Sequence, residues 1–199
     1  MSATVAGGSG TEPTFDDVVR TRRSIRRYEP RAVPDAVIDE LLDLACCAPS
    51  SMGLQPWHFV IVREPAALER LAKIKNEFCL PDKREYAADF IGKAPVLVAV
   101  CVDRDRSGRR ERENGVIVAT FVLLAAASRG LAGVYMTGYH PDDPGLAAAI
   151  TDELALQSHV VPIALLPLGY PAEEAAPKER WPLASRIHRE RFRTEESIP

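Results

Sequence analysis

The sequence predicts an α+β fold or a three-layer α/β/α sandwich, in which a sheet lies between helices. Three short β-branched runs, at 57–63, 96–102 and 160–168, are bounded by prolines and predict buried strands. Helical patterns precede the first run and separate the others, which favours this fold class. The 199 residues, 46% of them hydrophobic, are enough to form one sizeable core. The pattern does not give the strand order.

Two helices are expected before the first strand. Thr14 and Asp17 have the spacing of a capping box, and an apolar stripe follows them until about Arg22. Pro34 stands where a second helix can begin, and apolar residues then recur at helical spacing until Pro49. We therefore expect helical structure to precede the sheet in the chain.

The longest helix is expected at about 112–129. It is apolar on more than one face, as expected of a helix buried against a sheet or another subunit. A shorter strand is predicted at 132–136. Residues 1–13 are expected to form a disordered tail, and residues 14–199 one domain. The last part of that domain, 170–199, is rich in Pro, Glu, Lys and Arg and is expected to be an extended arm.

Composition narrows the function classes. A formal net charge of −3 is not typical of a protein that binds nucleic acid or anionic lipid through a general positive field. Neither a secretory signal nor a run of roughly 20 apolar residues is present, so we expect a cytoplasmic protein without a membrane segment. We expect reduced thiols at the four cysteines, Cys46, Cys47, Cys79 and Cys101. No metal is predicted, because metal-ligand spacing is absent among the four histidines, His58, His140, His159 and His188.

A cluster of arginines points to an anion site. Five of the eight residues at 20–27 are arginine. In an extended segment Arg22, Ser24 and Arg26 would share one side, and two guanidinium forks with a hydroxyl between them suit a phosphate group. Lys178 and Arg180 could close over the same anion. The alternatives are a solvated basic face or a DNA-binding module, and the second is disfavoured because such a surface normally contacts several phosphates.

A second candidate segment is the turn at 49–58, which precedes the first strand. Its two hydroxyls at Ser50 and Ser51, the amide of Gln55 and the ring of Trp57 could bind the edge and the face of a heterocycle. The alternative is an ordinary loop with Trp57 in the core.

Together these segments resemble the nitroreductase family. Three segments match its motifs in order and separation, so that the resemblance runs from about Thr14 to Phe192: Arg22-Arg23-Ser24-Ile25-Arg26, Pro49 to His58, and Leu168-Gly169-Tyr170-Pro171 through Lys178 and Arg180. The resemblance implies the nitroreductase-like sandwich, a homodimer, and two FMN sites at the subunit interface. It also implies an extended C-terminal arm.

The resemblance further implies which residues bind FMN. One subunit would contribute the residues that bind mainly the phosphate, which are Arg22, Arg23, Ser24, Arg26, Lys178 and Arg180. The other subunit would contribute a loop with Pro49, Ser50, Ser51, Met52 and Gln55. Backbone N–H groups near flavin N5 would come from Met136, Thr137 and Gly138. One position departs from the family, because Gly53 replaces its usual asparagine. This departure puts one contact to the ring edge or substrate in doubt.

The implied function is transfer of a hydride from NADH or NADPH through FMN to a small oxidised acceptor, such as a nitroaromatic or a quinone, by a ping-pong mechanism. The flavin performs the chemistry, so no catalytic side chain is predicted. Three other reactions of this fold stay open: reductive dehalogenation, flavin fragmentation and dehydrogenation. A flavin-sequestering protein is a further alternative. Region 76–93, with Phe78, Tyr86 and Phe90, either helps to cover the flavin or packs a local helix.

Overall fold

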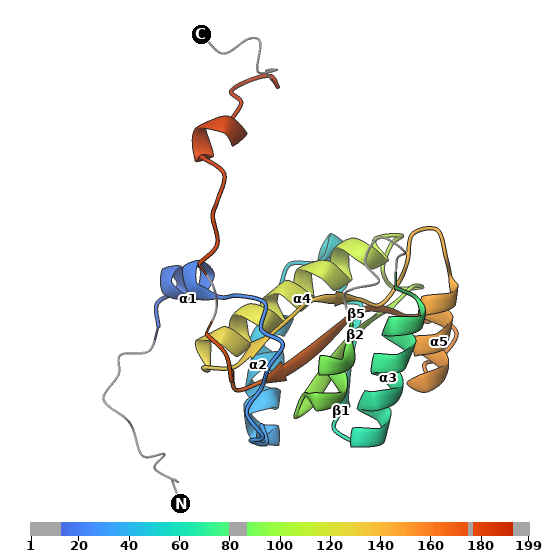
Figure 1. The fold of residues 1–199 in the computed structure, drawn as a ribbon. Helices are drawn as coiled ribbons and strands as arrows, with labels where there is room; N and C mark the ends of the chain where they lie inside the picture. The colour runs from blue at the N-terminus through green and yellow to red at the C-terminus, as the bar shows by residue number, and fades with distance from the viewer. Residues whose placement is uncertain (1–12, 80–86, 175–176, 193–199) are drawn as a thin grey trace, which may run out of the picture.

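The computed structural model of the protein describes residues 13–79, 87–174 and 177–192 (Figure 1). Residues 1–12, which make up almost all of the expected N-terminal tail, lie outside the described residues. Within the described ranges, no helix is long and apolar enough to cross a membrane.

The described residues form a five-stranded sheet with the order β1-β2-β5-β3, in which β4 also pairs with β5. All pairs between named strands are antiparallel. The three long predicted strands are confirmed as β1 (Trp57–Val62), β2 (Val96–Asp103) and β5 (Val160–Gly169). The predicted strand at 132–136 is two short ones, β3 (Ala132–Gly133) and β4 (Met136–Thr137).

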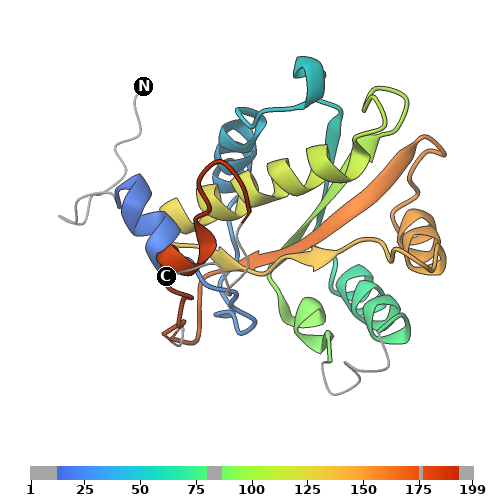
Figure 2. The ribbon, with the colours of Figure 1, turned by 90° about the horizontal axis from the view of Figure 1, so that it is seen from above.

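Helices cover both faces of this sheet (Figures 1 and 2). On one face lie α2 (Asp35–Cys46) and α4 (Glu111–Ser128), and on the other lie α3 (Pro65–Glu77) and α5 (Gly145–Glu153), with the short 3-10 helix η3 (Asp89–Lys93) packed against α3. The three-layer α/β/α prediction is therefore confirmed, and the expected helix at 112–129 is shifted by one residue at each end.

The central strand β2 shows why two helical layers are needed. All eight of its residues are buried. Val96, Val98 and Val100 belong to the apolar cluster with α2 and α4, while the residues between them belong to the cluster with α3 and α5. Because side chains alternate between the faces of a strand, a continuous apolar run is stable only when both faces are covered.

The first helix, α1 (Phe15–Thr21), begins as the sequence predicts. The Thr14 hydroxyl accepts the Asp17 N–H at 3.2 Å, and the Asp17 carboxylate accepts the Thr14 N–H at 3.0 Å. These two bonds form the expected capping box. After α1 the chain runs extended toward the sheet.

The helix α4 packs unusually close to β5. A Cβ atom on Gly115 would lie 2.6 Å from the side chain of Ile163, so only glycine allows this approach. At the other end of the chain, residues 177–192 run away from the sandwich and contain one short 3-10 helix, η4 (Leu183–Arg186) (Figure 1). Large apolar side chains of this segment, among them Trp181 and Phe192, are exposed.

Candidate functional site

The segment after α1 joins the beginning and the end of the chain. Ser24 forms a parallel bridge with Gly133, and the Ile25 N–H donates to the Gly133 carbonyl at 3.2 Å. Further along, Tyr28 forms an antiparallel bridge with Pro171, next to a bond from the Ala172 N–H to the carbonyl of Arg27. The N-terminal and C-terminal motifs are therefore held side by side by backbone hydrogen bonds.

The side chains of this segment alternate as expected for extended chain. Ile25 is 5% exposed and points into the body, whereas Ser24 is exposed and Arg26 is half-buried. Arg22 is also half-buried. This alternation leaves the two arginines and the hydroxyl available on the other side.

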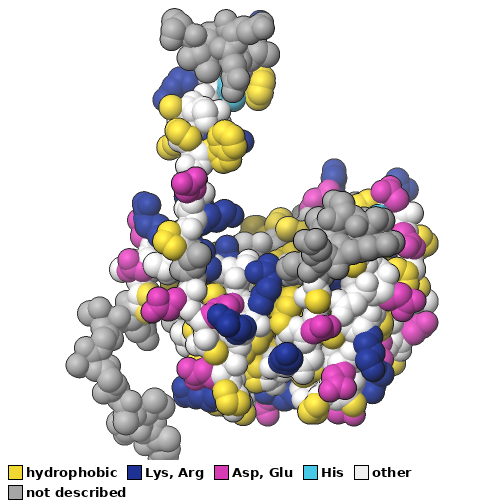
Figure 3. All heavy atoms as spheres, in the orientation of Figure 1, with side chains coloured by type: hydrophobic (Ala, Val, Ile, Leu, Met, Phe, Trp, Pro, Cys, Tyr) yellow, Lys and Arg dark blue, Asp and Glu magenta, His cyan; other side chains and the backbone are white. Residues whose placement is uncertain are grey.

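A polar cavity of about 590 Å³ brings the two basic clusters together, although they are more than 150 residues apart in the chain. Lys and Arg side chains gather on the face where the C-terminal segment leaves the sandwich (Figure 3). The polar lining of the cavity comprises six donors and three carboxylates: Arg22, Arg23, Ser24, Arg26, Lys178 and Arg180; Glu173, Glu174 and Glu179. Such a donor set suits a phosphate group.

The carboxylate of Glu173 has a structural partner on each side. Its Oε1 accepts the backbone N–H groups of Arg26 at 2.8 Å and Arg27 at 3.2 Å, and its Oε2 accepts the Nε–H of Arg27 at 2.9 Å. The pKa of Glu173 is lowered, first by the bond from the Arg26 N–H and also by Arg27. This residue thus connects the C-terminal segment to the arginine segment, in addition to placing a negative charge near the cavity.

Arg23 has a partly different environment from the other arginines. Its Nη1 donates to the carbonyls of Arg20 at 2.8 Å and Arg22 at 2.9 Å, which caps the end of α1. Its Nε is buried and has no hydrogen-bond partner among the described residues. A buried donor without a partner is costly, so this nitrogen lowers the stability of the folded chain.

A second cavity, of about 470 Å³, lies beside β4 and is more apolar; we call it the ring cavity. Its lining comes from α3, β4 and the segments around them: Lys75, Phe78, Cys79, Ala88, Tyr135, Met136, Thr137, Tyr139, His140 and Leu146. Lys75 Nζ donates to the Thr137 carbonyl at 2.8 Å. Burial lowers the pKa of the Lys75 ammonium.

The three residues expected near flavin N5 differ in what they can offer. Thr137 is exposed and lines the ring cavity. The Gly138 N–H donates to the Ile163 carbonyl at 2.8 Å, so this amide is already used inside the sheet. Met136 is only 8% exposed and its side chain belongs to the core.

The two cavities lie along one stretch of backbone. Gly133 pairs with Ser24 at the polar cavity, and Thr137, four residues further on, lines the ring cavity. Four extended residues span about 13 Å. Arg26 also lies 5.8 Å from the ring centroid of Phe90, on η3. A ligand with a phosphate at one end and a flat ring at the other could therefore follow this stretch.

The central motif is held by a buried asparagine. The side-chain oxygen of Asn114 accepts the Ser51 N–H at 2.9 Å, and its amide nitrogen donates to the Ser107 carbonyl at 3.3 Å. Asn114 is 1% exposed. Within the loop, the Gln55 N–H donates to the Ser50 hydroxyl oxygen at 2.9 Å. Of the predicted loop residues, three are exposed and two are half-buried: Pro49, Met52 and Gln55; Ser50 and Ser51.

Among the residues that the structure describes in one chain, this loop lies far from the arginine segment. Asn114 is in the first turn of α4, whereas Arg22 lines a cavity with Leu123 and Ala127 near the last turn. A helix of 18 residues is about 27 Å long. Figure 2 shows α1 beside one end of α4, whereas η1 (Ser51–Gly53) lies to the side of α4 and nearer its other end.

The glycine that departs from the family motif has a simple backbone explanation. Gly53 has φ of +66°, and a Cβ atom there would have no neighbour within 4 Å. Glycine and asparagine are the residues that most easily adopt this left-handed conformation. The replacement therefore keeps the loop backbone and removes one amide side chain. Trp57 is buried in the core, so its ring is not available to stack on a ligand.

Sequence reasoning did not find Lys75, Glu173 or Asn114. Lys75 and Glu173 are single charged residues without a distinctive spacing, and their roles depend on contacts with distant segments. Asn114 follows three charged residues at the start of α4, so its polarity did not distinguish it either. In the region expected to cover the flavin, Phe78 lines the ring cavity, while Tyr86 lies outside the described residues.

Within the described ranges, no group of three or more His, Cys, Asp or Glu side chains is arranged to hold a metal ion. The cysteines among these residues are unbridged.

Comparison with known proteins identifies the family. Residues 19–170 match the model of the Nitroreductase family. A protein of Methanothermobacter thermautotrophicus, provisionally named NADH dehydrogenase/NAD(P)H nitroreductase, is 35% identical over 178 residues, which cover 88% of this chain and 86% of that protein. The chain belongs to the nitroreductase family.

Two further proteins are also similar to this chain. The iodotyrosine deiodinase of Haliscomenobacter hydrossis is 31% identical over 178 residues, which cover 77% of this chain and 78% of that protein. A crystal structure from Parabacteroides distasonis, provisionally named NADH dehydrogenase/NAD(P)H nitroreductase, has a TM-score of 0.78 at 29% identity and covers 89% of this chain and 98% of its own.

Proposed function

We propose that this nitroreductase family member is an FMN-dependent oxidoreductase that takes a hydride from NADH or NADPH and reduces a small oxidised acceptor, such as a nitroaromatic or a quinone. The observation that carries the proposal is the meeting of Arg22, Ser24 and Arg26 with Lys178 and Arg180 around one polar cavity. The nicotinamide-linked name of the Methanothermobacter relative supports it. A cytoplasmic location, where both nicotinamide cofactors are supplied, fits this function, as does a single domain at 14–199.

The residues present fit FMN at both ends. Guanidinium and ammonium groups with one hydroxyl would hold the phosphate. At the ring cavity, Lys75 brings a cation close to the backbone of Thr137, where it would stabilise negative charge on a reduced ring. Bound FMN would supply the redox chemistry, receiving a hydride from the nicotinamide before the acceptor enters, which predicts ping-pong kinetics.

We further propose that two copies of the chain share each site. The central loop and the arginine segment lie at opposite ends of α4, so a loop that contacts the flavin must come from a second copy. Large apolar side chains are exposed on α1, α4 and the C-terminal segment, among them Phe15 (72%), Val116 (38%) and Trp181 (75%). Complete burial of a fully exposed side chain of this kind stabilises by about 1.5–3 kcal/mol, and a partly exposed one such as Val116 contributes less, which still favours an interface here.

The first test is retention of flavin. The protein is mixed with FMN, freed of excess, and its visible spectrum is recorded before and after anaerobic addition of NADH or NADPH. We expect retained flavin that bleaches with at least one donor. Arg26→Gln should weaken FMN binding, whereas Arg31→Gln, an arginine that stacks on Tyr170 outside the cavity, should not. Absence of flavin binding by the wild type would refute the proposal.

The shared site is tested by mixing subunits. One variant carries Arg26→Gln, and the other carries Ser51→Ala with Gln55→Ala. In a heterodimer of the two, one site has both defects and the other has none, so random mixing should restore about one quarter of the sites. If FMN binding does not recover after unfolding and refolding the mixture, the sites are not shared in this way.

Reductive dehalogenation is the second candidate, because the deiodinase of Haliscomenobacter hydrossis is 31% identical. In this reaction two electrons and one proton replace the iodine of an iodotyrosine ring by hydrogen and release iodide. The test is anaerobic incubation of the FMN-loaded protein with dithionite and 3-iodotyrosine, followed by measurement of iodide. Release with this substrate, combined with no reduction of nitroaromatics or quinones by NAD(P)H, would favour the deiodinase function.

A further inference from the structure

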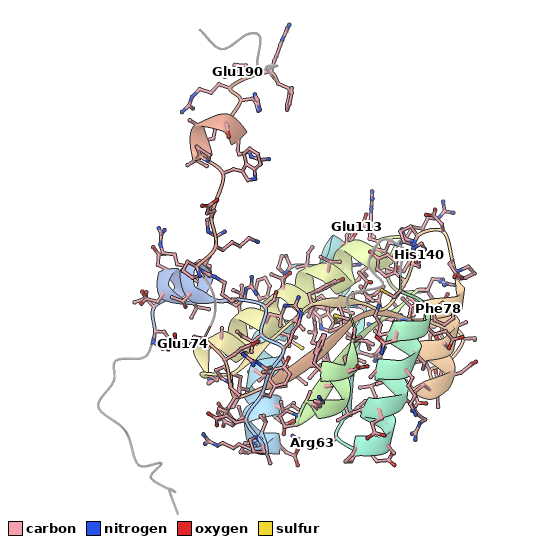
Figure 4. All side chains as sticks on the ribbon, viewed as in Figure 1. Arg63, Phe78, Glu113, His140, Glu174 and Glu190 are labelled. Atoms are coloured by element: carbon pink, nitrogen blue, oxygen red, sulfur yellow. The ribbon has the colours of Figure 1, made fainter. Side chains whose placement is uncertain are left out.

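A third cavity adjoins the ring cavity and is separate from the polar cavity around Arg22. It measures about 590 Å³ and lies between the turn before α4, the first turn of α4 and the segment before α5. Tyr139 and His140 line both this cavity and the ring cavity. In Figure 4, His140, Glu113 and Phe78 lie along one edge of the domain, away from Arg63. The two cavities are therefore neighbours at this edge.

The positive charges in the lining of the third cavity come from three arginines, Arg104, Arg109 and Arg112. None of them forms an ion pair with a carboxylate among the residues that the structure describes. Arg112 instead lies 4.5 Å from the ring centroid of Tyr139, on the wall common to both cavities.

Three carboxylates also line the third cavity, and one of them is already paired. Glu113 accepts a hydrogen bond from Arg110, outside the lining, at 3.1 Å. The other two, Glu111 and Asp142, form no ion pair among the described residues. When Glu113 is counted with Arg110, three arginines and two carboxylates remain in the lining, which leaves one net positive charge. The cavity can therefore bind an anionic group, with affinity that falls as salt concentration rises.

We propose that this third cavity binds the diphosphate-bearing part of the nicotinamide dinucleotide that reduces the flavin. The inference rests on the proposed function, which places a flat ring in the ring cavity. A dinucleotide carries its diphosphate one ribose away from the nicotinamide, so a donor whose nicotinamide reaches that ring needs a cationic site in the adjoining space. Guanidinium groups suit phosphate oxygens because they donate two parallel hydrogen bonds.

His140 and Arg112, which both line the third cavity, have identifiable partners. The Nδ1 of His140 accepts the Asp142 N–H at 3.2 Å, so the proton of the neutral ring lies on Nε2. Arg112 is held on Tyr139, which reduces the number of positions its guanidinium can take. Arg112 is therefore a positioned donor in the lining of the third cavity.

The kinetic test compares two hydride donors that differ in phosphate. NADH carries the diphosphate, and N-benzyl-1,4-dihydronicotinamide has the same reactive ring without it. In Arg104→Gln and Arg112→Gln, the ratio of kcat/KM for NADH to kcat/KM for the benzyl compound should fall about fivefold to tenfold. Arg106→Gln is the matched control, because Arg106 is exposed on the same turn and does not line the cavity. An unchanged ratio in the first two variants would overturn the inference.

A binding test decides the matter without turnover. ADP-ribose, which has the diphosphate but no nicotinamide, is titrated calorimetrically into the FMN-treated protein. We expect binding that weakens at least fivefold in Arg104→Gln and Arg112→Gln and less than twofold in Arg106→Gln. No binding to the wild type, or equal binding to all variants, would refute the site. If the protein fails to hold FMN, the proposed function fails, and this titration still tests the cavity.

Discussion

The contacts of Glu173 lead to a prediction that distinguishes two substitutions of this residue by their effect on FMN binding. Glu173→Ala removes the acceptor of two backbone N–H groups, at Arg26 and Arg27, and of the Arg27 guanidinium. Glu173→Gln keeps an oxygen for the backbone N–H groups and removes the negative charge from the polar cavity. If the carboxylate serves mainly to connect the two segments, only the alanine variant should weaken FMN binding.

The magnitude follows from the number and exposure of these bonds. Hydrogen bonds to a charged group contribute about 1.5–3 kcal/mol each when buried, but the Glu173 side chain is 22% exposed, so water replaces part of the loss. We expect a total of about 2 kcal/mol, which corresponds to roughly a 30-fold higher Kd for FMN in Glu173→Ala. Glu173→Gln should stay within about threefold of the wild type or bind more tightly.

Fluorescence quenching of FMN on titration with protein measures these constants. Glu174→Ala is the matched control, because Glu174 is exposed and lines the same cavity, and no hydrogen bond of its side chain is seen among the described residues. It should change the Kd by less than about threefold. Equal tightening of FMN binding by both Glu173 variants would refute the reasoning, since the charge and not the connection would then dominate.

Three further predictions concern the folded chain. Gly53→Asn should leave the free energy of unfolding in urea within about 0.5 kcal/mol of the wild-type value. Gly53→Val should lower it by about 1–2 kcal/mol, because valine is strained at positive φ. Equal effects of the two substitutions would contradict this explanation. Asn114→Ala should lower the free energy of unfolding by about 2 kcal/mol, because it leaves the Ser51 N–H and the Ser107 carbonyl unpaired. The exposed control Thr120→Ala should lower it by less than about 0.5 kcal/mol. Similar losses in both variants would argue against a stabilising role for the two Asn114 hydrogen bonds. Burial raises the pKa of the Cys101 thiol to about 12, against 9.0 for an exposed thiol, so the unfolded chain loses this proton first and stability falls as pH rises from about 9 to 12. At pH 10 this thiol should lower the free energy of unfolding by about 1.4 kcal/mol. The measurement is urea unfolding of the wild type and of Cys101→Ala at pH 8 and pH 10, and the wild type should lose more stability between the two pH values. An identical pH dependence in both proteins would exclude a contribution from the Cys101 thiol.

Much of the fold was predictable because its signals are local. The β-branched runs predicted β1, β2 and β5, since a strand buried on both faces is a short continuous apolar run. The capping box at Thr14 is likewise complete within four residues. Boundaries were less exact: the second helix ends at Cys46, before Pro49, and the strand expected at 132–136 is interrupted.

In the candidate site, too, local features were predictable from the sequence and long-range contacts were not. By itself the sequence determined the chemical character of the anion site, because alternation in extended chain places Ser24 and Arg26 on the side opposite Ile25. Only the tertiary structure decided what surrounds that segment. The strand order places Gly133 and the C-terminal segment beside it, where Glu173 accepts its backbone N–H groups.

The tertiary structure likewise decided where the central motif lies. A hydrogen bond from the Ser51 N–H to the buried Asn114, 63 residues away, attaches the loop to the first turn of α4. Such pairings depend on how the chain closes over long separations, and no spacing along the sequence encodes them. The residue types were therefore readable from the sequence, whereas their partners were set by the packing of α4 on the sheet.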